Sequence, residues 1–236
     1  MRKFIQNKYI WVFVTYLLIF IFVPYGMKFI LYLLEAGPEK DVSFGEYHLN
    51  SMMVLVINIL LLLIILAYIS VLYQKTSLFQ WRKPKVKGKD FLYAVFVFLG
   101  GKMIAAVFLI IISFFFDFNL EFTSRNQDAV EEMMRTSYIA FFHITILAPI
   151  IEEFFFRKII IGHIFSQHKY VGLIISSLLF GGMHVVTSFT LIGMIIYSSI
   201  GFSLGLVYIK TNRLEASVVA HSFNNLIPYL LLLIVR

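Results

Sequence analysis

The chain has 236 residues, of which 60% are hydrophobic and 14% are charged. A soluble domain is nearer half apolar and a quarter charged, so this composition, with a mean hydropathy of +0.88, excludes an ordinary soluble protein and indicates a polytopic membrane protein. The net charge of +7 does not indicate a nucleic-acid partner, because the basic residues fall in short stretches between apolar segments. The absence of cysteine excludes disulfides, iron–sulfur clusters and a cysteine nucleophile.

Apolar segments of membrane-spanning length follow one another along the chain. About 20 apolar residues span a bilayer, so the length allows roughly six to eight spans. We therefore expect one all-α transmembrane domain over residues 1–236, a helix bundle of about seven to eight spans. The expected spans are residues 9–34, 52–73, 91–116, 138–164, 171–186, 191–209 and 214–235.

Three of these segments carry local signals. The first apolar run has no small-residue cleavage site at its end, so we expect a retained span, with a kink at Pro24, rather than a secretory signal. The polar stretch after the third span predicts a short surface helix at residues 128–135. The fourth span is expected to be one helix to about Ile164, because no breaker is apparent before Gly162.

Basic and acidic connections alternate along the chain. Residues 75–90, 165–170 and 210–213 are basic, whereas residues 35–46 and 117–135 are mainly acidic. The positive-inside rule then predicts a multi-pass protein of the cell membrane with a cytoplasmic N-terminus and an outer C-terminus.

A pair of glutamates lies inside the fourth span, in Ile150-Ile151-Glu152-Glu153-Phe154-Phe155-Phe156-Arg157. A buried carboxylate costs several kcal/mol or more unless it is paired or protonated, so ionisable residues at membrane depth indicate a functional site. Arg157 follows Glu153 by four residues, the spacing at which the two side chains meet on one helix face. Glu152 points about 100° away and has no such partner on its own helix.

Two other spans place polar side chains at a similar depth. With a rise of about 1.5 Å per residue from the cytoplasmic end, Glu152 lies roughly 18 Å deep, His184 roughly 20 Å, His221 roughly 12 Å and Asn225 roughly 18 Å. Small residues precede His184, so another helix can approach it closely. His221 and Asn225 are four apart and share a face. Each of these residues also has a structural interpretation, as a hydrogen-bonding or ion-pairing link between helices.

Glutamate and histidine around a water form a hydrolytic site. A buried glutamate is a competent general base, and His221 and Asn225 are suitable donors to the oxyanion of a tetrahedral intermediate. Alternatively, Glu152, His184 and His221 supply ligand types that bind Zn²⁺, which would acidify the water itself. The chain has neither a His-Glu-x-x-His pair nor a Gly-x-Ser-x-Gly turn, which argues against the usual helical zinc signature and against serine catalysis.

Three motifs in this order carry a family resemblance. Glu152-Glu153-x-x-x-Arg157, then Phe180-x-x-x-His184, then His221-x-x-x-Asn225 resemble the CPBP family of intramembrane proteases. This family comprises the CAAX proteases and the bacteriocin-processing Abi proteins, and is related to the Rce1-type prenyl endopeptidases. The resemblance covers residues 147–227, and Lys158 departs from it because many members have glycine there.

The resemblance implies an α-helical enzyme that hydrolyses peptide bonds within the membrane. By position, Glu152 and His184 would activate the water and His221 and Asn225 would form the oxyanion hole, while Glu153 and Arg157 complete the first motif. From the apolar segments we expect spans 1–3 and an outer loop over residues 1–137, followed by a catalytic core over residues 138–236 that carries the three motifs. The resemblance implies a peptide or membrane-protein substrate. Both a zinc-assisted and a metal-free mechanism remain open. The alternative function is a non-proteolytic bacteriocin-immunity or membrane scaffold protein of the same fold, because fold does not fix function.

Overall fold

The computed structural model describes residues 8–35, 49, 51–75, 88–116, 141–186 and 189–234. Every regular element within these ranges is a helix, so the predicted all-α class is confirmed. Helices are expected of such segments because, in lipid, a helix satisfies its backbone N–H and C=O groups within one segment. The surface helix predicted at residues 128–135 lies outside the described residues.

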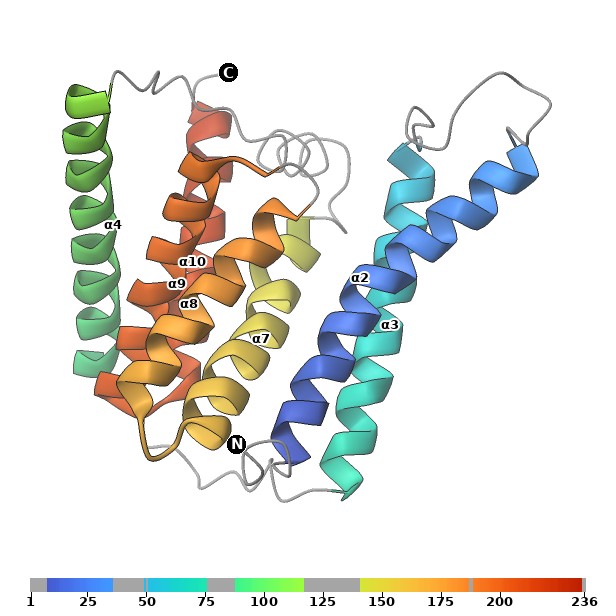
Figure 1. The fold of residues 1–236 in the computed structure, drawn as a ribbon, viewed down its shortest axis with the longest axis horizontal. Coiled ribbons are helices and arrows are strands. Elements are labelled where there is room, and N and C mark those ends of the chain that lie inside the picture. The colour runs from blue at the N-terminus through green and yellow to red at the C-terminus, as the bar shows by residue number, and fades with distance from the viewer. Residues whose placement is uncertain are drawn as a thin grey trace. The chain divides into compact units, whose positions relative to one another are not determined.

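The chain divides into two compact units, residues 10–84 and residues 1–9 with 85–236. The first unit contains the helices α2 (Lys8–Glu35) and α3 (Ser51–Lys75), drawn in blue and cyan in Figure 1. Helix α2 continues through Pro24. The hydroxyl of Tyr68 on α3 donates to the carbonyl of Val12 on α2 across 3.1 Å, which links the two helices.

The second unit carries all three motifs. Its elements in chain order are α4 (Gly88–Phe116), η2 (His143–Leu147), α7 (Ala148–Glu153), η3 (Phe154–Ile164), α8 (Lys169–Val185), α9 (Leu191–Thr211) and α10 (Leu214–Ile234). Helix α9 packs against α4, α8 and α10, and α10 also contacts α7 and η2. This packing brings the motif-bearing helices α7, α8 and α10 together (Figure 1).

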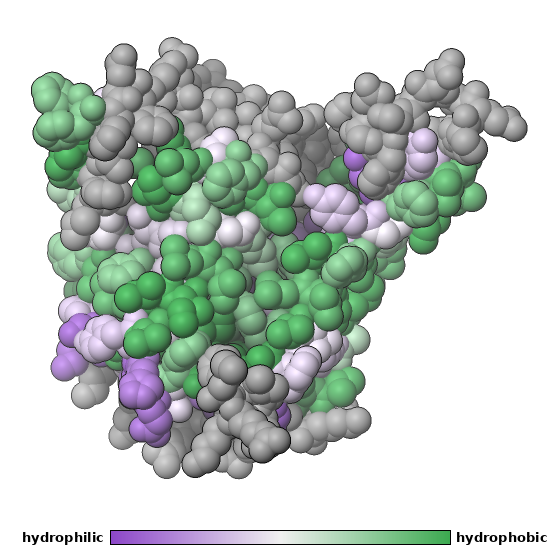
Figure 2. Space-filling model, viewed as in Figure 1, coloured by the Kyte–Doolittle hydropathy of each residue, from purple (hydrophilic) through white to green (hydrophobic). Residues whose placement is uncertain are grey.

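Several helices are suited to a membrane. Among the described residues, Lys8–Leu34, Met52–Leu72 and Leu191–Thr211 are long and apolar enough to cross one, and Phe91–Met103 and Lys169–Val185 are shorter apolar helices. Hydrophobic residues cover most of the described surface in the view of Figure 2. Large apolar side chains such as Phe96, which is 71% exposed, suit contact with lipid. The total of seven to eight spans stays a prediction.

The helix of the first motif ends at Ile164, as the sequence predicted. Its type changes along its length, because residues 143–147 and 154–164 are π-helical and α7 occupies the six residues between them. Pro149, which has no N–H to donate, lies at the start of α7, so the expectation of no breaker before Gly162 overlooked it. Such π-helical turns are frequent at functional sites.

Close packing beside His184 agrees with the sequence. A Cβ added to Gly181 on α8 would collide with Ser198 on α9, so this glycine lets the two backbones approach. Gly201 on α9 repeats the arrangement against Ser177 and Phe180 of α8. A Cβ added to Gly182 would meet nothing within 4 Å, so of the two glycines before His184 only Gly181 allows the close approach of α9.

Candidate active site

Glu153 and Arg157 form a buried ion pair, as the sequence predicted. Arg157 Nε lies 2.9 Å from Glu153 Oε2, and both side chains are 0% exposed. Glu153 is the last residue of α7 and Arg157 lies in the first turn of η3, so the ion pair forms across the change of helix type. The attraction between the two opposite charges offsets part of the cost of burying them, and removal of either one would leave the other uncompensated.

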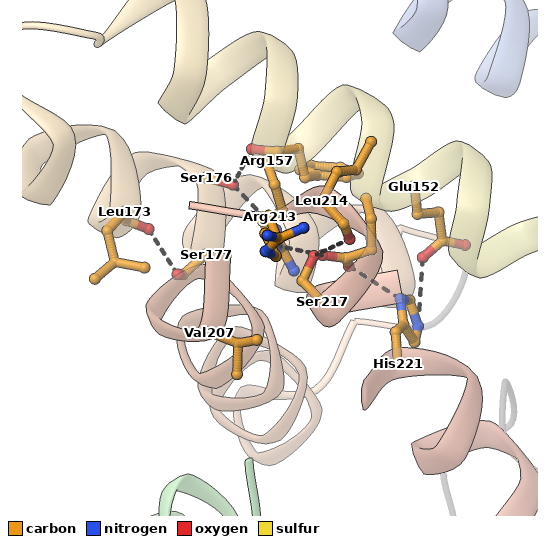
Figure 3. Close-up of polar contacts among 12 residues, drawn as sticks. Glu152, Arg157, Leu173, Ser176, Ser177, Val207, Arg213, Leu214, Ser217 and His221 are labelled. Atoms are coloured by element: carbon orange, nitrogen blue, oxygen red, sulfur yellow. Dashed lines mark hydrogen bonds and ion pairs between the residues drawn. The ribbon is translucent and has the colours of Figure 1, made fainter. Parts of the chain in front are cut away.

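Arg157 is anchored to α8 as well. Its Nη1 donates to Ser176 Oγ across 3.1 Å, and that hydroxyl donates onward to the carbonyl of Phe156 across 2.7 Å (Figure 3). The guanidinium carbon also lies 5.1 Å from the ring centroid of Phe180, a cation–π distance. Arg157 therefore ties η3 to α8 through both polar and aromatic contacts.

Glu153 is also connected to α10. Ser217 Oγ donates to Oε2 across 2.6 Å, and Nδ1 of His221 lies 3.0 Å from Oε1. Ser217 and His221 are four residues apart, so both reach the carboxylate from one face of α10. Sequence reasoning did not single out Ser217 or Ser176, although the place of Ser217, one helical turn before His221, was an available signal.

His221 contacts both glutamates, whereas the sequence prediction paired it only with Glu152 and Asn225. A carboxylate accepts, so the Nδ1–H of His221 donates to Glu153, and in the neutral ring Nε2 then carries a lone pair. That Nε2 lies 3.8 Å from Oε2 of Glu152 (Figure 3). The Glu153 hydrogen bond thus fixes which nitrogen of His221 faces Glu152.

His184 is oriented in the same way by its own helix. Its Nδ1 donates to the carbonyl of Phe180 across 2.8 Å, since a carbonyl can only accept. Its Nε2 lies 3.8 Å from Oε2 of Glu152. The ring also stacks on Tyr197 of α9, with centroids 4.7 Å apart and an interplanar angle of 23°. Backbone and ring contacts together hold Nε2 toward the glutamate.

Glu152 differs from its neighbour. Oε2 of Glu152 is buried and has no hydrogen-bond partner in the described part of the chain, and the side chain is 13% exposed. Two imidazole Nε2 atoms, from α8 and α10, face this one oxygen. The predicted meeting of Glu152, His184 and His221 is confirmed. When both rings are neutral, all three atoms are acceptors, and a water molecule is the smallest group that can donate to two of them at once.

Asn225 makes polar contacts away from this oxygen. Its Nδ2 donates to the carbonyl of Ile144 across 3.0 Å, and its Oδ1 accepts from Nδ2 of Asn224 across 2.9 Å. Ile144 belongs to the π-helical turn η2, so α10 is pinned to the segment just before the first motif. The predicted role of Asn225 in an oxyanion hole stays a prediction.

Zinc was the predicted alternative to an activated water. Glu152, His184 and His221 have suitable donor atoms, and each histidine donates its other ring N–H to an oxygen, as zinc ligands do. Ligands of one tetrahedral zinc ion would lie about 3.3 Å apart, given zinc–nitrogen bonds of roughly 2.0 Å. Here the separations are 3.8 Å, and the described residues contain no group of three such side chains arranged to hold an ion. This arrangement does not fit zinc closely, and zinc stays a prediction.

Sequence comparison supports the family resemblance. Residues 134–227 match the family described as type II CAAX prenyl endopeptidase Rce1-like. The chain is similar over 113 residues, at 29% identity, to "Putative membrane peptidase YdiL" of Bacillus subtilis (strain 168). It is similar over 109 residues, at 28% identity, to "Membrane-embedded CAAX protease MroQ" of Staphylococcus aureus (strain USA300).

These similarities cover part of each protein. They span 47% and 43% of this chain and 44% and 42% of YdiL and MroQ, so less than half of either relative is matched. No solved structure matches the chain. The family segment contains every residue of the three motifs, including Glu152, His184 and Asn225.

Proposed function

We propose that this chain is an intramembrane endopeptidase of the CPBP type, which hydrolyses a peptide bond of a peptide or membrane-protein substrate. The observation that carries this proposal is that Nε2 of His184 and Nε2 of His221 both face the buried Oε2 of Glu152, which has no hydrogen-bond partner among the described residues. A structural ion pair would instead resemble Glu153, whose carboxylate is already bonded to its neighbours. Glu152 keeps its capacity to accept a proton.

A water molecule between Glu152 and His184 is the proposed nucleophile. It donates one hydrogen to Oε2 of Glu152 and the other to Nε2 of His184, which leaves an oxygen lone pair for the substrate carbonyl carbon. As the C–O bond forms, Glu152 takes the water proton as general base. Glu152 then gives this proton to the leaving nitrogen as the C–N bond breaks, so the carboxylate is regenerated.

The tetrahedral intermediate carries its charge on the former carbonyl oxygen. Asn225 is proposed as one donor to this oxyanion, and His221 as the other when Nε2 is protonated. Glu153 accepts from Nδ1 of His221 and so stabilises the imidazolium. Removing one such donor typically costs about 10²–10³ in rate. At this stage Glu152 holds the water proton and is neutral, so the oxyanion itself balances the charge of the imidazolium.

The proposed substrate is a peptide chain that enters the bilayer. The apolar helices around the site suit a membrane-embedded segment, and no nucleic acid is expected as a partner. One relative is named a CAAX protease, but the proposed reaction needs only an amide bond whose carbonyl carbon the water can reach. We propose a multi-pass protein with a cytoplasmic N-terminus, on the basis of the basic connections in the sequence.

Purified protein in lipid vesicles tests the proposal. Wild type, Glu152→Gln and the exposed control Lys169→Ala are incubated with a mixed library of hydrophobic peptides, and the products are identified by mass spectrometry. Wild type and Lys169→Ala should release the same fragments, whereas Glu152→Gln should release none. Equal fragment release by all three variants would remove the assignment of Glu152. An intact library with every variant would favour an immunity or scaffold function.

A further inference from the structure

The carbonyl of Ile144 has no donor within its own helix. In an α-helix it would accept from the N–H of residue 148, and in a π-helical turn from the N–H of residue 149. The N–H of Ala148 instead donates to the carbonyl of His143. Residue 149 is proline and has no N–H. The change of helix type and Pro149 together leave this carbonyl unsatisfied by the backbone.

Asn225 satisfies it from 81 residues away. Its Nδ2 lies 3.0 Å from Ile144 O, and because a carbonyl only accepts, the amide end at this position must be the NH₂ group. Asn224 Nδ2 donates to the other end, Oδ1, across 2.9 Å. The carboxamide of Asn225 is therefore held at both ends, and a 180° flip would place Oδ1 against the carbonyl of Ile144.

One hydrogen of Asn225 remains for another acceptor. Nδ2 carries two hydrogens, and within the described ranges only the bond to Ile144 uses one of them. Asn225 follows His221 by one helical turn on the same face of α10, so it is on the side that presents Nε2 of His221 to Glu152. The amide is thus fixed with one N–H engaged and one N–H available.

We propose that Pro149 is a positioning residue for the reaction, because it frees the carbonyl of Ile144 that orients the amide of Asn225. The inference rests on the proposed function, in which Asn225 donates to the oxyanion. If Pro149 served only to end the π-helical turn, the carbonyl that it frees would have no reason to bind Asn225. Here the carbonyl that lacks its helical donor belongs to η2, and the side chain that binds it comes from α10.

Pro149→Ala restores an N–H that can bond to Ile144 O and compete with Asn225. Removing a proline from a helix does not weaken it, so this variant should be at least as resistant to thermal unfolding as wild type. Its kcat should fall by roughly tenfold, less than the full loss of an oxyanion donor, with KM unchanged. Pro24→Ala, in the helix α2, is the matched control and should keep the wild-type kcat.

A double-mutant cycle separates positioning through Asn225 from a general disturbance. In an Asn225→Ala background, Pro149→Ala should change kcat by less than about twofold, because the residue it acts through is gone. A full, additive loss in that background would overturn the proposal. So would a wild-type kcat for Pro149→Ala alone, and that result would leave the endopeptidase function standing.

A spectroscopic measurement does not depend on cleavage. In protein labelled with ¹⁵N-asparagine, the two Nδ2 hydrogens of Asn225 should differ in exchange rate with solvent, because one is bonded to Ile144. Pro149→Ala should bring the two exchange rates closer together, whereas Pro24→Ala should not. Unchanged rates in Pro149→Ala would overturn the link between Pro149 and Asn225. Because this measurement needs no substrate, it stands even if the wild type cleaves nothing.

Discussion

His221 donates its Nδ1–H to Oε1 of Glu153 across 3.0 Å and thereby joins α10 to the end of α7. Glu153 is therefore more than the counterion of Arg157 that the i to i+4 spacing predicts. It selects the ring nitrogen of His221 that faces Glu152. The two adjacent glutamates thus have different roles, and this difference can be measured.

The first prediction compares Glu153→Gln with Glu152→Gln. Glu153→Gln leaves the fully buried charge of Arg157 without its counterion, and breaking a buried pair typically costs about 3–5 kcal/mol. Oε2 of Glu152 accepts no hydrogen bond from the described residues, so the unfolding temperature of Glu152→Gln should stay near that of wild type. Thermal unfolding in detergent measures both. Equal stability of the two variants would contradict the division of roles.

The second prediction concerns Ser217. Its hydroxyl donates to the Glu153 carboxylate across 2.6 Å, and hydrogen bonds to charged groups contribute about 1.5–3 kcal/mol. Ser217→Ala should therefore lower the stability by this amount and reduce cleavage, because Glu153 then holds His221 less firmly. Ser177→Ala is a matched control, since within the described ranges that buried hydroxyl bonds only to Leu173 O of its own helix. A larger loss in Ser177→Ala would contradict the assigned role of Ser217.

The third prediction concerns His184. His184→Ala removes an acceptor of the proposed water, and the contribution of a positioned acid–base group is typically about 10²–10⁴ in rate. Cleavage in vesicles should fall by that factor, while the protein still accumulates in the membrane. His168→Ala, at an exposed position before α8, should cleave at the wild-type rate. Equal rates for the two variants would remove His184 from the mechanism.

Much of the fold followed from the sequence because apolar length alone determines membrane helices. The predicted spans at residues 171–186 and 191–209 differ from α8 and α9 by only a few residues at each end. The helix of the first motif was predicted to continue to Ile164, and it does, but its π-helical stretches at residues 143–147 and 154–164 leave no clear periodic signal in an apolar run. The boundaries of hydrophobic helices were predictable, but a local change of helix type was not.

The candidate site followed from depth and from side-chain periodicity. The ion pair of Glu153 with Arg157 needs only the positions of residues on one helix, and it was predicted correctly. The hydrogen bond between Ser217 and Glu153 joins residues 64 positions apart, so it depends on how α7 packs against α10. The same holds for the contact of Asn225 with Ile144. Contacts between helices are set by packing, which no single-helix pattern contains.

The fourth prediction concerns zinc. The separations of 3.8 Å between Oε2 of Glu152 and the two Nε2 atoms suit a bridging water better than a shared ion. Protein purified without chelator should therefore contain much less than one zinc per chain by elemental analysis, and cleavage should survive dialysis against a chelator. One tightly held zinc per chain, with activity lost on its removal and regained on its return, would establish the zinc-assisted alternative.

The central claim is that Glu152 activates the water that cleaves a peptide bond in the membrane. A comparison of the membrane peptidomes of cells that express wild type, Glu152→Gln or Lys169→Ala tests it most directly and also reveals the substrate. Fragments present with wild type and Lys169→Ala should be missing with Glu152→Gln, and their uncut precursors should accumulate at equal protein levels. Identical peptidomes for wild type and Glu152→Gln would contradict the claim.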